Sequence, residues 1–110
     1  MRQASIFYKE ILAGILTETD DGEYTFKYDD NYIINHPLDF ISLTMPVRSK
    51  IYTEKRLFPF FEGLIPEGWL LDIASKNWKI NPNDRMGLLL ACCHNCIGAV
   101  SVQPIHNENE

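Results

Sequence analysis

Three cysteines and a histidine lie within five consecutive positions, in the run Cys92-Cys93-His94-Asn95-Cys96. Cys93 and Cys96 have the Cys-x-x-Cys spacing, which lets two sulfur atoms converge on a zinc ion or form a redox-active pair. A tetrahedral zinc site needs two further ligands, and the other histidines, His36 and His106, stand alone in the sequence. We therefore expect the cysteines to act as small apolar side chains at a helix end, with a metal or redox role as the alternative.

Other catalytic patterns are missing from the sequence. The six glycines are scattered singly, so no run of backbone N–H groups could cradle a phosphate. Cys96 with His94 as its base would lack an orienting acid, and His36 and His106 are expected to be solvated. The acidic pairs at residues 20–21 and 29–30 stand beside Gly22 or Asn31, which favours turns over a calcium site. We expect no enzyme activity and no cofactor or metal.

The two tryptophans lie in a segment with helical periodicity. At 100° per residue, Trp78 falls on the apolar stripe of this helix with Leu70, Ile73 and Ala74, and is expected to be buried. Trp69 falls on the polar flank in the first turn, where a large aromatic ring is costly to leave in water. Trp69 is therefore either an anchor for a partner protein or a side chain that folds back on the preceding loop.

Length and charge narrow the class of protein. The chain has 110 residues and a net charge of −5, which fits one domain and lacks the Lys/Arg excess of a nucleic-acid binder. Residues 40–85 carry a modest excess of basic residues, and the two ends of the chain are acidic. This distribution is compatible with a surface that binds another protein. The longest apolar run falls well short of the about 20 residues that span a bilayer. We expect a reduced, soluble, cytoplasmic protein without membrane contact.

Alternating polar and apolar residues predict the strands. Residues 23–28 alternate without a break and place Tyr24, Phe26 and Tyr28 on one face. Residues 41–45 alternate again and place Ile41, Leu43 and Met45 on one face. Further strands are expected at residues 4–8, 11–16 and 97–102. Pro46 and Pro104 are expected to end the strands before them, and residues 32–39 to form a loop.

Helical signals dominate the second half of the chain. A short helical turn is expected around residues 57–61, ended by Gly63, and longer helices at residues 67–78 and 85–93, the latter capped from residues 81–84. Strands, then helices, then a closing strand predict an α+β fold, a small antiparallel sheet packed against two or three helices. Residues 1–104 would form one domain, and residues 105–110 a disordered polar tail.

The order of these segments resembles the N-terminal subdomain of HipA-type serine/threonine kinase toxins. The matching motifs extend from about Ile6 to Pro104, and their order and spacing together carry the resemblance. They are Ala13-Gly14-Ile15-Leu16, Gly22 with Tyr24, Phe26, Tyr28 and Asp29, Ile41-Ser42-Leu43-Thr44-Met45-Pro46, Phe60-Phe61-Glu62-Gly63-Leu64-Ile65-Pro66-Glu67-Gly68, Asp84 with Gly87-Leu88-Leu89, and Cys96-Ile97-Gly98-Ala99-Val100.

The kinase core that follows this subdomain in the full-length toxins has no counterpart in this sequence. No Asp-x-x-x-x-Asn catalytic loop and no metal-holding Asp are present, so phosphoryl transfer by this chain is not expected. The pattern is similar to the HipS-type small component of split HipBST systems, in which the subdomain is encoded apart from a shortened kinase, HipT.

The resemblance implies an antitoxin that docks on a HipT- or HipA-like kinase and inhibits it. The family's inserted tryptophan matches Trp69, and the expected partner-binding residues are Ile65, Pro66, Glu67, Gly68, Trp69 and Leu70. Ile65, with Phe60 and Phe61, fits the core equally well. A HipB-like helix-turn-helix protein is expected as a third component, with no direct contact of this chain to nucleic acid. The alternative is a structural subunit that completes the kinase fold and bridges it to that third component without inhibiting it.

Overall fold

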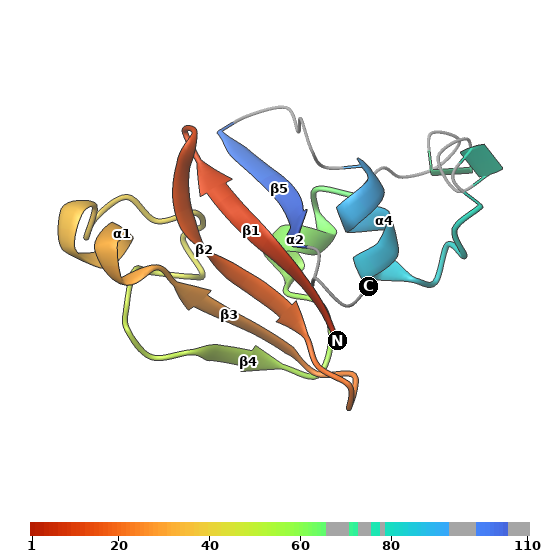
Figure 1. Cartoon of the computed structure of the whole chain (residues 1–110), viewed down its shortest axis with the longest axis horizontal. Helices are drawn as coiled ribbons and strands as arrows, with labels where there is room; N and C mark the ends of the chain where they lie inside the picture. The colour runs from red at the N-terminus through yellow and green to blue at the C-terminus, as the bar shows by residue number, and fades with distance from the viewer. Residues whose placement is uncertain (66–70, 73–75, 78, 93–98, 106–110) are drawn as a thin grey trace.

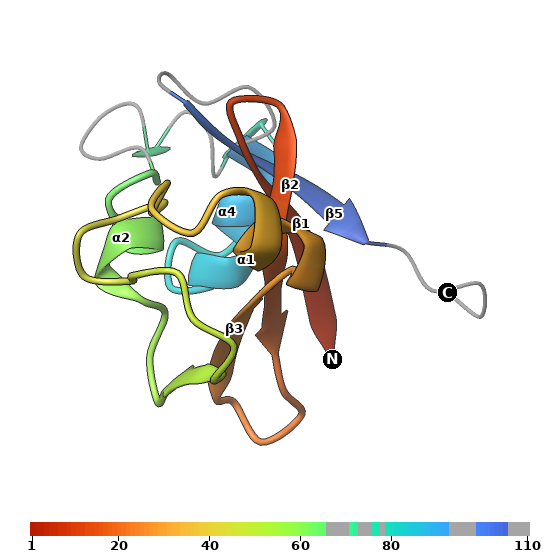
Figure 2. The ribbon, with the colours of Figure 1, turned by 90° about the vertical axis from the view of Figure 1, so that its left-hand side faces the viewer.

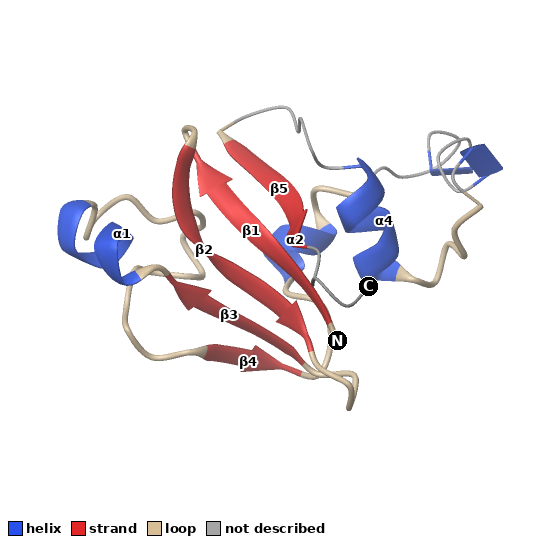
Figure 3. Ribbon diagram, in the orientation of Figure 1, coloured by secondary structure: helices blue, strands red, loops and turns tan. Residues whose placement is uncertain are grey.

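The computed structural model describes residues 1–65, 71–72, 76–77, 79–92 and 99–105. In this part of the chain, five strands form one antiparallel sheet in the order β4-β3-β2-β1-β5 (Figure 1). The strands are β1 Arg2–Tyr8, β2 Ile11–Glu18, β3 Tyr24–Tyr28, β4 Tyr52–Glu54 and β5 Val100–Ile105. The helices, blue in Figure 3, are α1 Asp30–Asn35, α2 Pro59–Glu62 and α4 Arg85–Cys92. The predicted α+β fold class is confirmed.

Helices α2 and α4 lie on the same face of the sheet. Figure 2 shows both on one side of the strands, together with the chain that connects α1 to β4. The core fills the space between these layers, and strand residues two positions apart point into it, as the period of a strand requires. Its fully buried large side chains are Ile6, Leu16, Phe26, Tyr28, Tyr32, Phe61, Met86, Leu88, Leu89 and Val102.

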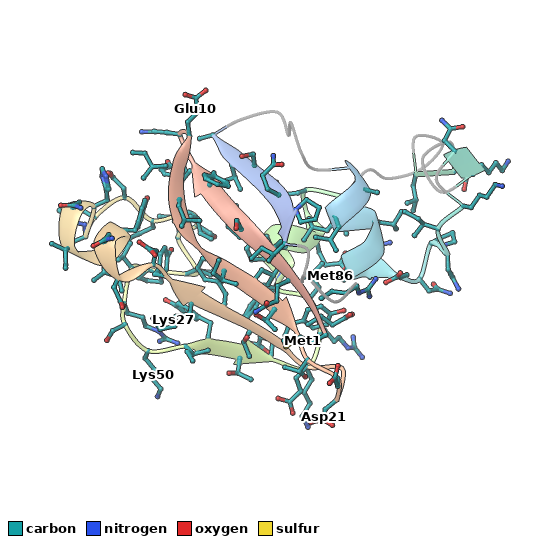
Figure 4. The ribbon with its side chains drawn as sticks, viewed as in Figure 1. Met1, Glu10, Asp21, Lys27, Lys50 and Met86 are labelled. Carbon is teal, nitrogen blue, oxygen red and sulfur yellow. The ribbon has the colours of Figure 1, made fainter. Side chains whose placement is uncertain are left out.

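Strands β1, β2 and β3 form the centre of the sheet, and all three were predicted. Figure 4 labels Glu10 in the turn between β1 and β2 and Asp21 in the turn between β2 and β3. Gly14 lies in the middle of β2. Any other residue would be crowded there, because a Cβ would stand 2.4 Å from the Lys27 carbonyl oxygen and 2.7 Å from the Phe26 ring. The absence of a side chain at this position lets the Phe26 ring and the Lys27 carbonyl approach the backbone of β2 closely.

Helix α1 replaces part of the loop that was expected at residues 32–39. The Asp29 carboxylate caps it by accepting the N–H groups of Asn31 and Tyr32, at 3.1 and 3.3 Å. The pattern was missed because six residues are too few to show helical periodicity. His36, expected to be solvated, is half-buried at the end of α1, with Nδ1 3.2 Å from the Asp39 carboxylate.

Residues 41–45 form a tight turn, so the strand predicted there is wrong. The Ser42 hydroxyl accepts the N–H of Thr44 at 3.3 Å, and the Met45 N–H donates to the Ser42 carbonyl at 3.0 Å. Met45 is buried, whereas Leu43 is 91% exposed. Tyr28 fastens this turn to the sheet, because its hydroxyl donates to the Met45 carbonyl.

The two edge strands also differ from the sequence-based expectation. Strand β4 was not predicted, because three residues carry too short an alternation to recognise. Strand β5 includes Pro104, which was expected to end it, and extends to Ile105. A proline fits here because β5 pairs with β1 on one side, and none of the described strands pairs with its other edge.

Of the three predicted helical segments, the first and third are confirmed as α2 and α4. The second, at residues 67–78, is described only at residues 71–72 and 76–77, all of them helical. Trp78, which was expected to be buried, lies outside the described residues, as does the expected start of the last strand at residues 97–98.

Candidate functional site

The predicted partner-binding residues fall mostly outside the described part of the chain. Pro66, Glu67, Gly68, Trp69 and Leu70 are not described, whereas Ile65 is 3% exposed and belongs to the core. In the isolated chain Ile65 therefore anchors the segment before Trp69 and presents no surface of its own. The described residues on both sides of this segment define how it joins the fold.

Helix α2 precedes Ile65, the last described residue before the predicted binding segment. Pro59 opens the helix at a position where its missing N–H costs nothing, and the N–H of Gly63 closes it by donating to the Pro59 carbonyl at 3.0 Å. Phe61 is fully buried, with its ring 5.8 Å from that of Phe26 in β3. Because the Phe61 ring touches the central sheet, helix α2 is tied directly to the core.

Helix α4 follows the described residues 79–84. Asp84 caps this helix, because its Oδ1 accepts the N–H of Gly87 at 3.2 Å while its carbonyl accepts the N–H of Leu88 at 3.0 Å. This cap was predicted from residues 81–84. Asn81 shapes the preceding turn by accepting the N–H of Asn83 on its side-chain oxygen at 2.8 Å.

A bidentate ion pair joins these two helices. The Arg85 guanidinium donates from Nε and Nη2 to both carboxylate oxygens of Glu62, over 2.9–3.1 Å. Nη1 of Arg85 also donates to the Pro82 carbonyl at 3.0 Å. The two side chains are about one-third exposed, so the pair is only partly screened by water. Its fork geometry fixes the distance and the orientation between α2 and α4.

A second arginine joins the start of α4 to the sheet. Arg2 donates to both oxygens of Asp84 at 2.7 and 3.0 Å, and to both oxygens of Glu18 at 2.7 and 2.9 Å. Tyr24 donates to the same Glu18 carboxylate at 3.1 Å. Figure 4 labels Met1 and Met86, which mark the two segments that Arg2 brings together. We call Arg2, Glu62, Asp84 and Arg85, with helices α2 and α4, the helical junction.

The charges of the helical junction shift the proton affinities of its members. Hydrogen bonds from Arg2 lower the pKa of the Asp84 carboxyl, and the N–H of Gly87 adds to this effect. The same contacts, with Asp84 first and Glu18 second, raise the pKa of Arg2 further above its usual range. Burial raises the pKa of Tyr24 to about 12, and its bond to Glu18 adds to the shift. The shifts in the pKa values of Arg2 and Asp84 therefore both favour the charged forms of this pair.

Comparison with known proteins agrees with this architecture. The family model described as the HipA N-terminal domain matches residues 4–103. The chain belongs to the HipA N-terminal domain family. A Haemophilus influenzae protein described as uncharacterized is 32% identical over 103 residues, which cover 94% of this chain and 92% of that protein. A solved structure titled "N-terminal domain of HipA toxin" has a TM-score of 0.73 and 24% identity, and the match covers 98% of this chain and 96% of that one.

Membership of the HipA N-terminal domain family places this chain with the N-terminal part of HipA and not with its kinase catalytic part. Among the described residues, no three His, Cys, Asp or Glu side chains gather in a group that could hold a metal ion. The predicted alternative of a metal or redox site at Cys93 and Cys96 lies outside the described residues, as do His94 and His106.

Sequence reasoning missed the ion pairs of the helical junction. Glu62 and Arg85 are 23 positions apart, and Arg2 and Asp84 are 82 positions apart, so no local pattern connects them. One weak signal was present at the start of α4. An arginine as the first residue of a helix opposes the helix dipole, which favours acids there, so Arg85 needs an acidic partner from elsewhere.

An open groove was also missed. It has a volume of about 690 Å³ and runs between the β3–β4 edge and the start of α2. Its charged lining is balanced, with Glu23 and Glu54 against Lys55 and Arg56, and this balance favours no particular ligand. Among the described helices, none is long and apolar enough to cross a membrane.

Proposed function

We propose that this member of the HipA N-terminal domain family is an antitoxin. It docks on a HipT- or HipA-like serine/threonine kinase toxin and inhibits it, with Trp69 inserted at or near the kinase active site. The observation that carries the proposal is the family match over residues 4–103, which relates nearly the whole chain to one domain of a larger toxin. A protein that corresponds to one domain of a kinase has an obvious docking partner in the remaining domains.

The size of the relative supports a protein that works in trans. The Haemophilus influenzae protein is matched over 92% of its own length, so that relative is close to one such domain in size. In this proposal the complex forms in the cytoplasm and includes a HipB-like helix-turn-helix protein, which supplies the contact to DNA. The net charge of −5 agrees with DNA binding by the HipB-like protein and not by this chain, because the sequence lacks the Lys/Arg excess of a nucleic-acid binder.

The proposed mechanism is steric. Trp69 fills a pocket of the kinase and blocks nucleotide binding or domain closure, with Pro66, Glu67, Gly68 and Leu70 forming the surrounding contact. Ile65 contributes by holding the segment to the core, since its own side chain is buried. Tryptophan suits this role because its large, rigid ring buries much apolar area for little loss of conformational entropy.

The test is a kinase assay with the purified kinase and this protein, without the DNA-binding component. Wild-type protein should inhibit phosphorylation, and Trp69→Ala should weaken binding by about 2 kcal/mol or more while leaving the fold intact. Leu38→Ala is the matched control, because it removes a large, 82% exposed apolar side chain from another part of the surface. The control should inhibit like the wild type.

Two outcomes would count against this proposal. Full inhibition by Trp69→Ala at ordinary concentrations would remove Trp69 as the determinant. Unchanged or raised kinase activity with the wild-type protein would favour the alternative function, a structural subunit that completes the kinase fold and bridges it to the HipB-like protein.

A further inference from the structure

Basic residues stand before and after strand β4. Residues 48–56 hold four basic residues and one acidic residue, although the whole chain has a net charge of −5. Figure 4 labels Lys50 next to the start of β4 and Glu10 well away from it, in the turn between β1 and β2. The four basic side chains are exposed, and we call them the basic flank: Arg48, Lys50, Lys55 and Arg56.

The basic flank lacks carboxylate partners within the described chain. Two arginines outside it, Arg2 and Arg85, each form bidentate pairs with carboxylates. By contrast, no carboxylate of the described residues lies within ion-pair distance of the basic flank. The guanidinium carbon of Arg48 lies 3.6 Å from the centre of the Tyr52 ring, and its Nε donates to the Lys50 carbonyl at 3.3 Å. The positive charges of the flank are therefore available to an anionic partner.

Strand β4 offers an open backbone edge beside these charges. It stands last in the sheet order and pairs with β3, and none of the described strands pairs with its outer side. An unpaired strand edge presents N–H and C=O groups to which a further extended chain can bond. Natural edges are often protected by charges on the strand itself. Here residues 51–53 carry no charge, and Ile51 is 47% exposed, so the basic side chains flank the edge without blocking it.

The open groove lies along the same edge. Its volume of about 690 Å³ is lined by residues 53–57 together with Glu23 and Pro59. A smaller hollow of about 220 Å³ adjoins it and shares Pro59. Leu57 in the groove and Phe58 in the hollow are buried, so each depression has an apolar wall. Two neighbouring hollows at an edge strand suit an extended peptide, whose successive side chains point in opposite directions.

We propose that the β4 edge and its groove bind an extended, acidic segment of a partner protein, which adds a strand to the sheet. The backbone of that segment pairs with β4, and its carboxylates contact the basic flank on both sides of the strand. This surface is separate from the predicted partner-binding residues 65–70, so the inference goes beyond the proposed function.

The distribution of charge selects an acidic peptide over a nucleic acid. Two acidic and two basic residues balance within the groove, and the other members of the basic flank, Arg48 and Lys50, make the surface positive. A nucleic-acid strand carries a phosphate about every 3.4 Å and would bring some phosphates against the glutamates of the groove. A peptide with an acid at every second residue spaces them about 6.8 Å apart and can leave neutral residues opposite Glu23 and Glu54.

Binding of a synthetic peptide to the purified protein tests the proposal. The probe is a labelled, end-capped peptide of alternating glutamate and valine, followed by fluorescence anisotropy at low salt. The wild type should bind it, and the double variant Lys55→Glu/Arg56→Glu should bind about tenfold more weakly or worse, because two attractions become repulsions. Lys9→Glu/Lys79→Glu is the matched control, since it changes the net charge equally at two exposed lysines outside the groove and should bind like the wild type.

A second probe separates strand addition from simple charge attraction. A peptide with the same side chains and N-methylated backbone amides keeps every carboxylate but cannot donate hydrogen bonds to β4. It should bind about tenfold more weakly than the unmodified peptide. Equal binding of the two peptides would reduce the surface to a general anion attractor and overturn the proposal.

The remaining outcomes also decide the question. Tighter binding of the wild type to a short DNA duplex than to the glutamate–valine peptide would assign the surface to nucleic acid and overturn the proposal. Absence of binding at about 1 mM peptide, or equal losses in the double variant and its matched control, would overturn it as well. None of these measurements involves a kinase, so their outcome is independent of the proposed antitoxin function.

Discussion

The sheet and the helical junction are held together by different forces. The central strands bury aromatic and aliphatic side chains completely, and Phe26 meets Tyr28 edge to face at 4.9 Å. The junction relies on guanidinium–carboxylate forks whose side chains are about one-fifth to two-fifths exposed. Apolar burial is insensitive to pH, whereas partly exposed ion pairs respond to pH and salt.

This difference separates stability from positioning. A buried aromatic cluster supplies most of the free energy of folding but tolerates some repacking, so it defines orientation loosely. A bidentate fork contributes little net free energy and yet fixes two elements in one geometry. Substitutions in the two regions should therefore differ in size and in their dependence on solution conditions.

The largest effect is expected from Phe61→Ala, which removes the ring that joins α2 to the sheet. Phe61 is fully buried and contacts the rings of Phe26, Phe58 and Phe60. The free energy of unfolding should fall by about 3–5 kcal/mol in urea titration. Phe60→Ala, at a partly exposed neighbouring ring, should cost clearly less. A loss below about 1 kcal/mol for Phe61→Ala would contradict the role of apolar burial in this part of the fold.

Gly14→Ala should destabilise the sheet by about 1–3 kcal/mol, because the added methyl group must push against backbone and a buried ring. The matched control is Gly63→Ala, where the nearest atoms to a Cβ are carbonyl oxygens at 3.5 and 3.6 Å. That variant should keep or slightly raise the melting temperature. Equal melting temperatures for the two variants would show that the sheet relaxes around Gly14.

Asp84→Asn should lower the free energy of unfolding at pH 7 by about 1 kcal/mol, the size of a partly exposed ion pair. Asparagine still caps α4, so the loss isolates the charge. Because the folded protein lowers the pKa of Asp84, its contribution is complete above the unfolded pKa of about 3.9 and disappears as pH falls through the folded pKa.

The gap between wild type and Asp84→Asn should therefore close in acid, which urea titrations from pH 7 to pH 2 can follow. Asp30→Asn is the control, because its pair with Lys27 at 3.2 Å is far more exposed and should contribute only a few tenths of a kcal/mol. A gap that stays constant with pH would mean that the Asp84 charge is not coupled to folding.

The smallest effect is expected from Leu43→Ser. Leu43 is 91% exposed in the turn at residues 41–45, so its replacement should change the free energy of unfolding by less than about 0.5 kcal/mol. Met45→Ser, two positions along and buried, should cost several times more. The strand predicted from the sequence would make these two costs similar, so the ratio distinguishes the two structures directly.

The sequence predicted the elements whose signals are local and repeated. The unbroken alternation at residues 23–28 identified strand β3, and the turn at residues 81–84 identified the cap of α4. The prediction failed at residues 41–45, where the same alternation occurs without a strand. There the Ser42 hydroxyl offers the backbone a local hydrogen bond, and Tyr28 provides an attachment that only the fold can place.

The candidate site also combines features that the sequence predicted with features that only the structure revealed. Residue types and order led to the HipA resemblance, and that family is confirmed, whereas the role of Trp69 stays a prediction. The burial of Ile65 and the two arginine forks came only from the structure.

By itself, the sequence determined the central strands, the helix cap and the family, because periodicity and capping act between residues a few positions apart. The tertiary structure decided which charged residues pair, since Arg85 could meet Glu62, and Arg2 could meet Asp84, only after the sheet had brought distant segments together.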